Sequence, residues 1–166
     1  MKYLSTGALW LAIAAVLALT QAFTAFGQSN ELIGSWKNGS VGAISYQNRV
    51  TGSVKPGRGS LFTYKFLPGG TYEFIGYMEV TMYNCTTTLF NDVKGRYSVN
   101  GSTITLSPNR DFWKNTNSCA ASGNKTQLKT PKKETVQFEF KNNEYGQREL
   151  CITTDTGETC YRRNEN

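Results

Sequence analysis

The stretch Leu61-Phe-Thr-Tyr-Lys-Phe-Leu-Pro-Gly-Gly-Thr-Tyr-Glu-Phe-Ile-Gly-Tyr-Met78 alternates apolar and polar residues on both sides of a Pro-Gly-Gly turn. Successive side chains of a β-strand point to opposite faces of the sheet. The apolar residues therefore share one face in each half, namely Phe62, Tyr64 and Phe66 before the turn and Tyr72, Phe74 and Met78 after it. This pattern predicts a hairpin with an aromatic inner face and with Thr, Lys and Glu outside. The second strand either continues to Met82 or breaks and restarts around 86–90.

Alternation of the same kind continues towards the C-terminus. An Asn-Gly pair at 100–101 separates the runs 95–99 and 102–107, and Asn-Gly between alternating runs is a strong signal for a hairpin whose turn residues need positive φ. Tyr97 and Val99 would then share the interior with Ile104 and Leu106. Asn91-Asp92 predicts another turn. Further strands are expected at 32–37, 43–48, 135–140, 148–153 and 158–163, whereas 52–60 and 108–132 have the composition of loops.

These segments predict an all-β fold of about eight to nine short strands in up-and-down order. There is almost no helical periodicity beyond the N-terminal region. An open sheet of this size would expose two edges that invite aggregation, and closing the sheet into a barrel removes them. We therefore expect a single antiparallel β-barrel.

The N-terminal region has the three-part pattern of a secretory signal peptide. Lys2 provides the positive charge, residues 8–19 form an apolar run, and Ala25-Phe-Gly27 provides small residues before a cleavage site at Gln28. An uncleaved anchor is the alternative, but Thr20 and Gln21 end the run short of the ~20 apolar residues that a membrane-spanning helix needs. We expect a signal peptide at 1–27, a barrel domain at 28–166, and a secreted or periplasmic protein without a membrane span after cleavage.

Four cysteines lie beyond the predicted signal peptide: Cys85, Cys119, Cys151 and Cys160. An even number of cysteines in an exported domain indicates disulfides, and four cysteines allow three connectivities. We favour Cys151–Cys160 across a hairpin, with Cys85–Cys119 joining the long loop to a strand. There is no Cys-x-x-Cys, so no redox site or zinc site is indicated.

Most of the residue types that catalytic sites use are either absent from the chain or predicted at positions with a structural role. The chain contains no His, which removes the commonest general base and metal ligand. Asp92, Asp111 and Asp155 fall in expected turns or loops, where Asp commonly bonds its own backbone. Glu73 and Glu79 fall on a polar strand face. We therefore expect neither an enzyme, nor a metal site, nor a cofactor.

The formal net charge of +6 favours anionic partners only in a general way, because the Lys and Arg residues are scattered. Lys55 and Arg58, in the 52–60 loop, could meet an anion at a barrel mouth. The many Tyr and Phe residues follow strand periodicity, which places them inside a barrel and argues against a nucleic-acid surface. The expected partner is a small hydrophobic or anionic ligand, and the sequence does not identify a protein partner.

Several pieces of the chain together resemble bacterial lipocalin-like (calycin-type) proteins: Leu32-Ile-Gly-Ser-Trp36, the stretches 64–72 and 95–108, and Tyr161-Arg-Arg163. The resemblance implies a small secreted barrel in which the Trp of the first strand closes one end. It also implies that Arg162 or Arg163 packs over the ring of Trp36, where cation–π attraction would favour the contact. The second and third lipocalin motifs and a C-terminal helix are not evident.

Two functions follow as hypotheses. In the first, the barrel binds a small hydrophobic or amphipathic molecule against its inner aromatic residues, which are Phe62, Tyr64, Phe66, Tyr72, Phe74, Tyr97, Phe138 and Phe140. These residues could instead fill the core, because a barrel of eight strands is just wide enough for either. In the second hypothesis, a filled barrel acts through its loops as a periplasmic or surface interaction protein.

Overall fold

The computed structural model describes residues 30–41, 45–47, 54–56 and 59–164. The chain forms two compact units, Met1–Leu32 and Ile33–Asn166. In the first unit the described residues 30–32 are helical. Among the residues described, no helix has the length and hydropathy needed to cross a membrane.

The second unit is built almost wholly of strands. They are β1 (Gly34–Val41), β2 (Ser45–Gln47), β3 (Val54–Pro56), β4 (Gly59–Leu67), β5 (Thr71–Met82), β6 (Cys85–Asn100), β7 (Thr103–Asn117), β8 (Lys125–Leu128), β9 (Glu134–Asn142), β10 (Arg148–Thr154) and β11 (Gly157–Arg163). A short 3₁₀ turn, η1 (Ala121–Gly123), precedes β8.

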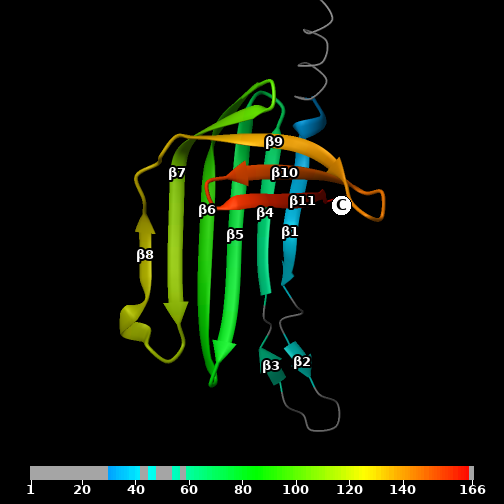
Figure 1. The fold of residues 1–166 in the computed structure, drawn as a ribbon. Helices are drawn as coiled ribbons and strands as arrows, with labels where there is room; N and C mark the ends of the chain where they lie inside the picture. Colours follow the sequence, from blue (N-terminus) through cyan, green and yellow to red (C-terminus); the bar gives the residue numbers. More distant parts are fainter. Residues whose placement is uncertain (1–29, 42–44, 48–53, 57–58, 165–166) are drawn as a thin grey trace, which may run out of the picture. The chain divides into compact units, whose positions relative to one another are not determined.

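Eight of these strands close into an antiparallel barrel, as predicted. The sheet runs in the order β6-β5-β4-β1-β11-β10-β9-β7, and pairing of β6 with β7 closes it. β8 adds to the outer part of β7 as an extra strand, and β2 pairs only with β3. In Figure 1, β9, β10 and β11 lie at the upper end of the barrel, while β5, β6 and β7 extend well below them.

The β4–β5 hairpin confirms the prediction made from residues 61–78. The register pairs Leu67 with Thr71, so residues 68–70 form the turn. β5 does not break after Met78 but continues to Met82. Tyr83 and Asn84 then make a two-residue turn in which both residues have positive φ (48° and 64°), which is the type I′ geometry of tight hairpins.

The β6–β7 hairpin is also confirmed, with one change in its turn. Asn100 pairs with Thr103, so Gly101 and Ser102 are the turn residues. Gly101 has φ of 57°, and Asn100 is not among the residues with positive φ. Gly at the first turn position matches type II′ geometry, which needs only one residue with positive φ.

The turn predicted at Asn91-Asp92 is wrong, because both residues lie in the middle of β6. Their polar side chains find partners across the sheet instead of in a turn. Asn91 donates hydrogen bonds to Oδ1 of Asp111 (2.9 Å) and to the carbonyl of Phe112 (2.9 Å). Asp92 faces outward and pairs with Arg110 (3.4 Å). Asp92 and Asp111, both expected in turns or loops, therefore lie in strands.

The long irregular segment predicted from Pro108 to Lys132 is also wrong in part. β7 continues through Pro108 to Asn117, and β8 follows at 125–128. A Pro interrupts a strand because it lacks an N–H to donate. Here Pro108 lies opposite Gly95 at a register shift in the β6–β7 pairing, and bulges of this kind accommodate such a residue.

Gly95 is required by the close approach of β7 at this bulge. A Cβ atom on residue 95 would lie 2.4 Å from the carbonyl oxygen of Ser107 and 2.5 Å from Cα of Pro108. We expect Gly95→Ala to lower the free energy of unfolding by about 1–3 kcal/mol, since backbone on both sides must move. Gly123→Ala is the control, because a Cβ there meets nothing within 4 Å. Urea denaturation measures both, and equal effects would contradict the role of the bulge.

The N-terminal strands differ from the expected ones in extent. The first strand begins at Gly34 rather than Leu32 and ends at Val41 rather than Lys37. The strand expected at 43–48 is reduced to β2 at 45–47, and it pairs with β3 inside the expected 52–60 loop. Residues 42–44, 48–53 and 57–58, including Arg58, lie outside the described residues.

Both preferred disulfides are confirmed. Cys151 and Cys160 are direct partners on β10 and β11, and they are bonded across this hairpin. Cys85, the first residue of β6, is bonded to Cys119 in the segment after β7. Two hydrogen bonds support the second crosslink, from the N–H of Ser118 to the Thr86 carbonyl and from the N–H of Thr86 to Oγ of Ser118.

Candidate functional site

One end of the barrel is closed by Trp36, which is fully buried. Its ring packs against Phe140, with 5.5 Å between centroids, and the Arg163 guanidinium lies 5.3 Å from its centroid. Arg163 also donates to the Ile33 carbonyl (3.1 Å). Gly34 leaves room for this side chain, because a Cβ there would lie 3.2 Å from Nη2 of Arg163.

Of the two arginines considered for this contact, only Arg163 lies over Trp36. Trp36 pairs with Arg163 across β1 and β11, so both side chains leave the sheet on the inner face. Arg162 alternates to the outer face and pairs with Glu149 (3.6 Å). Strand periodicity thus separates two neighbouring arginines into an inner and an outer position.

The eight aromatic residues expected inside the barrel divide into two groups. Four of them pack with one another or against Trp36, namely Phe66, Tyr97, Phe138 and Phe140, and a fifth, Phe62, stacks on Phe74. Phe66 and Phe138 have almost no exposed surface, and Tyr97 donates to the Leu67 carbonyl (3.3 Å). The remaining three, Tyr64, Tyr72 and Phe74, line a cavity.

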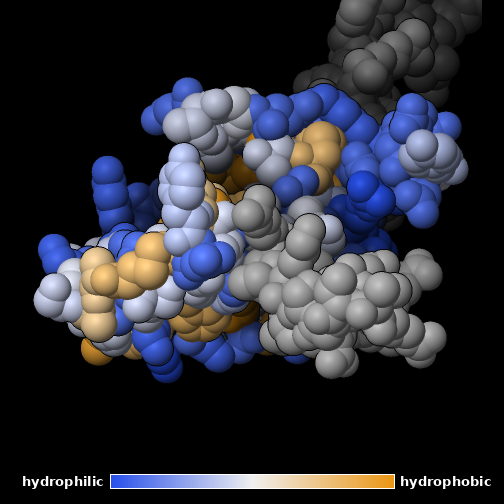
Figure 2. Space-filling view, turned by 90° about the horizontal axis from the view of Figure 1, so that it is seen from below, coloured by the Kyte–Doolittle hydropathy of each residue, from blue (hydrophilic) through white to orange (hydrophobic). Residues whose placement is uncertain are grey.

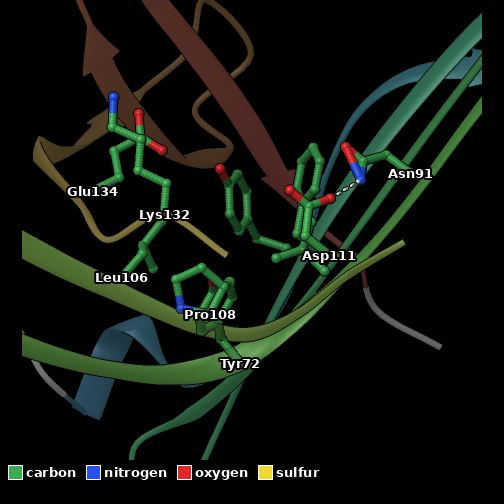
Figure 3. A pocket seen from close by; sticks show the side chains of 10 residues that line it. Tyr72, Asn91, Leu106, Pro108, Asp111, Lys132 and Glu134 are labelled. Carbon is green, nitrogen blue, oxygen red and sulfur yellow. Dashed lines mark hydrogen bonds between the residues drawn. The ribbon is translucent and has the colours of Figure 1, made fainter. Parts of the chain in front are cut away.

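The cavity has a volume of about 260 Å³. Besides the three aromatic residues it is lined by Asn91, Val93, Leu106, Pro108, Asp111, Lys132 and Glu134. In Figure 3, Lys132 and Glu134 lie on one side of this space and Asn91 and Asp111 on the other, with an aromatic ring between the two pairs. Of these seven residues, the sequence placed only Leu106 in the interior, and it identified none of them as lining a site. Val93 and Leu106 could have been found from alternation, but the polar residues carry no such signal.

Asp111 is the innermost charged group of the cavity. It lies on β7 directly opposite Val93 of β6, so its side chain shares the inner face with Val93 and Phe74. Its carboxylate is half-buried and accepts a hydrogen bond from the Asn91 amide (Figure 3). Buried carboxylates are normally paired with a cation. Within the described part of the chain, no Lys or Arg nitrogen lies within 4.0 Å of it.

Glu134 and Lys132 lie at the rim of the same cavity, and both residues are exposed. Neither forms an ion pair among the described residues. The cavity therefore contains two carboxylates and one ammonium group. Nearby, Lys129 lies over the Trp113 ring at 5.1 Å and is already engaged there.

Three tyrosines of the barrel interior hold their protons more tightly than usual. Burial, reinforced by the carboxylates of Glu134 and Asp111, raises the pKa of Tyr72 to about 12. Burial alone raises the pKa of Tyr161 to about 12. Burial also raises the pKa of Tyr64, with smaller contributions from Tyr161 and Glu134. These phenols are neutral hydrogen-bonding groups at physiological pH.

The tyrosine shifts predict a loss of stability at alkaline pH. Tyr72 ionises near pH 10 in the unfolded chain but only near pH 12 in the folded one. The unfolded state therefore binds fewer protons in this range, and the free energy of unfolding falls as pH rises from 10 to 12. We expect wild-type protein to lose more stability than Tyr72→Phe over this interval in denaturant titrations. Parallel losses in the two proteins would contradict the assignment.

The opposite end of the barrel is open and apolar. β7 pairs with β9 only over Thr103–Leu106, and its outer part pairs with β8. The inner face of β5 becomes steadily more exposed along the strand: Tyr72 is 3% exposed, Met78 40%, Val80 48% and Met82 62%. Figure 2, which views the barrel from this end, shows apolar surface exposed there.

A possible metal-ligand cluster is accounted for by a disulfide. Glu149, Cys151 and Cys160 place three candidate ligand atoms within 4.8 Å of one another. The two sulfur atoms are bonded to each other, and Glu149 pairs with Arg162. This cluster is therefore a structural crosslink and an adjacent ion pair.

The fold and the site define a class of protein: a small, disulfide-linked, antiparallel β-barrel with one plugged end and an interior cavity. The architecture is consistent with a calycin-like fold. No protein-family model, no curated protein and no solved structure matches the chain. Two disulfides are typical of proteins that fold outside the cytoplasm.

Proposed function

We propose that this protein is an exported, lipocalin-like binding protein that holds a small hydrophobic or amphipathic molecule inside the barrel without transforming it. The observation that carries this proposal is the exposed apolar inner face formed by Met78, Val80 and Met82. These residues share a face of β5 with Phe74, which lines the cavity. Contiguous exposed apolar surface of this kind marks binding sites.

The chemistry of the cavity supports binding and positioning. Its walls combine aromatic and aliphatic residues with four polar side chains, Asn91, Asp111, Lys132 and Glu134, and small-molecule sites use such polar groups to orient a ligand. The chain has no His to act as a base near neutral pH. Neutral Tyr64 and Tyr72 can orient a ligand by hydrogen bonding. A secreted or periplasmic location follows from the predicted signal peptide and is part of the proposal.

Binding can be tested with a neutral hydrophobic dye, N-phenylnaphthylamine, whose fluorescence rises in an apolar site. We expect saturable binding to protein purified without detergent, and weaker binding to Met82→Gln. Leu128→Gln is the matched control, because Leu128 is 73% exposed but pairs with Phe112, on the outer face. Equal losses in both variants, or no saturable binding at all, would overturn the proposal. Native mass spectrometry of the same preparation would show a co-purifying molecule directly.

The alternative function, a barrel that acts on a protein partner through its loops, stays a prediction. Much of the long segment that motivated it is strand in the structure, since β7 and β8 occupy residues 103–117 and 125–128. Recovery of one specific protein by crosslinking in the native envelope, together with absent dye binding, would favour this alternative.

A further inference from the structure

The cavity and the exposed end of β5 together form an amphipathic track on one strand face. Phe74 lies at the cavity, and Met78, Val80 and Met82 follow on the same face. Strand residues advance by about 3.4 Å each, so the track from Phe74 to Met82 is about 27 Å long. Gly76 lies between Phe74 and Met78, and the rings of Phe62 and Phe74 stack beside it.

The charged groups are confined to the inner end of this track. Asp111 and Glu134 line the cavity, while the residues exposed further along β5 on this face are uncharged. Asp111 is hydrogen-bonded to a neutral amide, and no described cation lies within ion-pair distance of it. A ligand cation placed there would form a charge-assisted hydrogen bond with this carboxylate, which is stronger than a hydrogen bond between neutral groups.

The aromatic residues of the cavity also favour a positively charged ligand group. Tyr64, Tyr72 and Phe74 surround the space beside Asp111, and aromatic faces attract ammonium groups. Both carboxylates contribute to the raised pKa of Tyr72, for which burial is the larger cause. Lys132 opposes this preference, but it is exposed at the rim and can extend into solvent.

We infer that the ligand is a long-chain amphipathic amine, whose ammonium group lies between Asp111 and Glu134 and whose alkyl chain runs past Phe74 along β5. A ten-carbon chain reaches the level of Met78, and longer chains reach Val80 and Met82. The inference rests on the proposed function and specifies the class of molecule bound. The unbranched, flexible Met side chains suit a chain of variable length and shape. The head group determines selectivity, and the length of the chain determines affinity.

Three probes of equal chain length separate this inference from the general binding function. Decylamine, decanol and decanoate are titrated calorimetrically, or by displacement of N-phenylnaphthylamine, into protein purified without detergent. We expect decylamine to bind about tenfold more tightly than decanol, as for one charged hydrogen bond, and decanoate to bind most weakly. Octylamine, nonylamine and decylamine should differ by up to about fourfold per added methylene.

Charge variants at the cavity provide the matched controls. Asp111→Asn and Glu134→Gln keep side-chain shape while removing charge, and each should weaken decylamine binding without changing decanol binding. Lys132→Gln should strengthen decylamine binding. Glu134 is exposed at the rim, so its variant tests the charge even if Asp111→Asn disturbs the sheet.

The outcomes distinguish the two proposals. If decanol or decanoate binds as tightly as decylamine, the amine inference is wrong and the binding function stands. If none of the three binds, both are wrong. If none binds and light scattering shows a dimer that Met82→Gln converts to a monomer, the apolar track is an interface between two copies of this chain.

Discussion

Trp36→Ala should lower the free energy of unfolding by about 3–5 kcal/mol, the range found when a large buried aromatic residue is truncated. Trp36 is fully buried, and the substitution leaves a cavity against Phe140. It also removes the ring beneath Arg163, whose guanidinium then has no aromatic face to cover. Since small domains are stable by about 5–15 kcal/mol, this single change removes much of the stability of the protein.

Guanidinium denaturation followed by far-ultraviolet circular dichroism measures the effect. Trp36→Phe should lose less, because a smaller ring still fills part of the space. Trp113→Ala is the control for loss of an indole as such, since Trp113 is only half-buried on the inner face of β7. A loss below about 1 kcal/mol for Trp36→Ala would contradict the idea that this residue holds the barrel end together.

Removal of the Cys85–Cys119 disulfide should have the second large effect. The crosslinked residues are 34 apart in sequence, and closing a loop of that length restricts the unfolded chain by about 4 kcal/mol in the loop-entropy description. The Cys151–Cys160 bond joins residues only 9 apart, for which the same description predicts about 2.5 kcal/mol. We therefore expect Cys85→Ala/Cys119→Ala to lose about 4 kcal/mol in urea denaturation.

Two further comparisons isolate the crosslink. The single variant Cys85→Ala should be as unstable as the double variant, because either change abolishes the bond. The hydrogen bonds between Thr86 and Ser118 remain available in both variants, so the loss acts mainly on the unfolded state. Stability within about 1 kcal/mol of wild type would show that the reduced chain keeps this loop closed without the bond.

The alternation of residues along the strands was sufficient to predict the barrel and the aromatic interior, and the even number of cysteines with the predicted hairpin favoured both disulfides. Hairpins such as residues 61–78 carry their pairing information locally, since the turn sets the register. The pairing of β1 with β11 joins two strands that lie far apart in the sequence. It pairs Trp36 with Arg163 across nearly the whole chain, and alternation along either strand does not identify its partner.

The cavity was harder to predict because its polar residues resemble turn residues. Asn91 and Asp111 have low strand propensity, yet tertiary pairing places them within β6 and β7. The Asn91 amide and the Asp111 carboxylate satisfy each other only because two strands bring them opposite. Pro108 is a further case, since its position in a strand depends on Gly95 in the neighbouring one.

Along β5, the residues that pack in the folded core lie at one end, and the residues that we propose to contact a ligand lie at the other. At the Tyr72 end the inner face of this strand belongs to the packed core, whereas Met78, Val80 and Met82 at the other end are largely exposed. Under the proposed binding function, substitutions in the outer half would change what is bound at little cost in folding free energy, while those in the inner half would not. A barrel built in this way can acquire a new ligand specificity by mutation without first gaining extra stability.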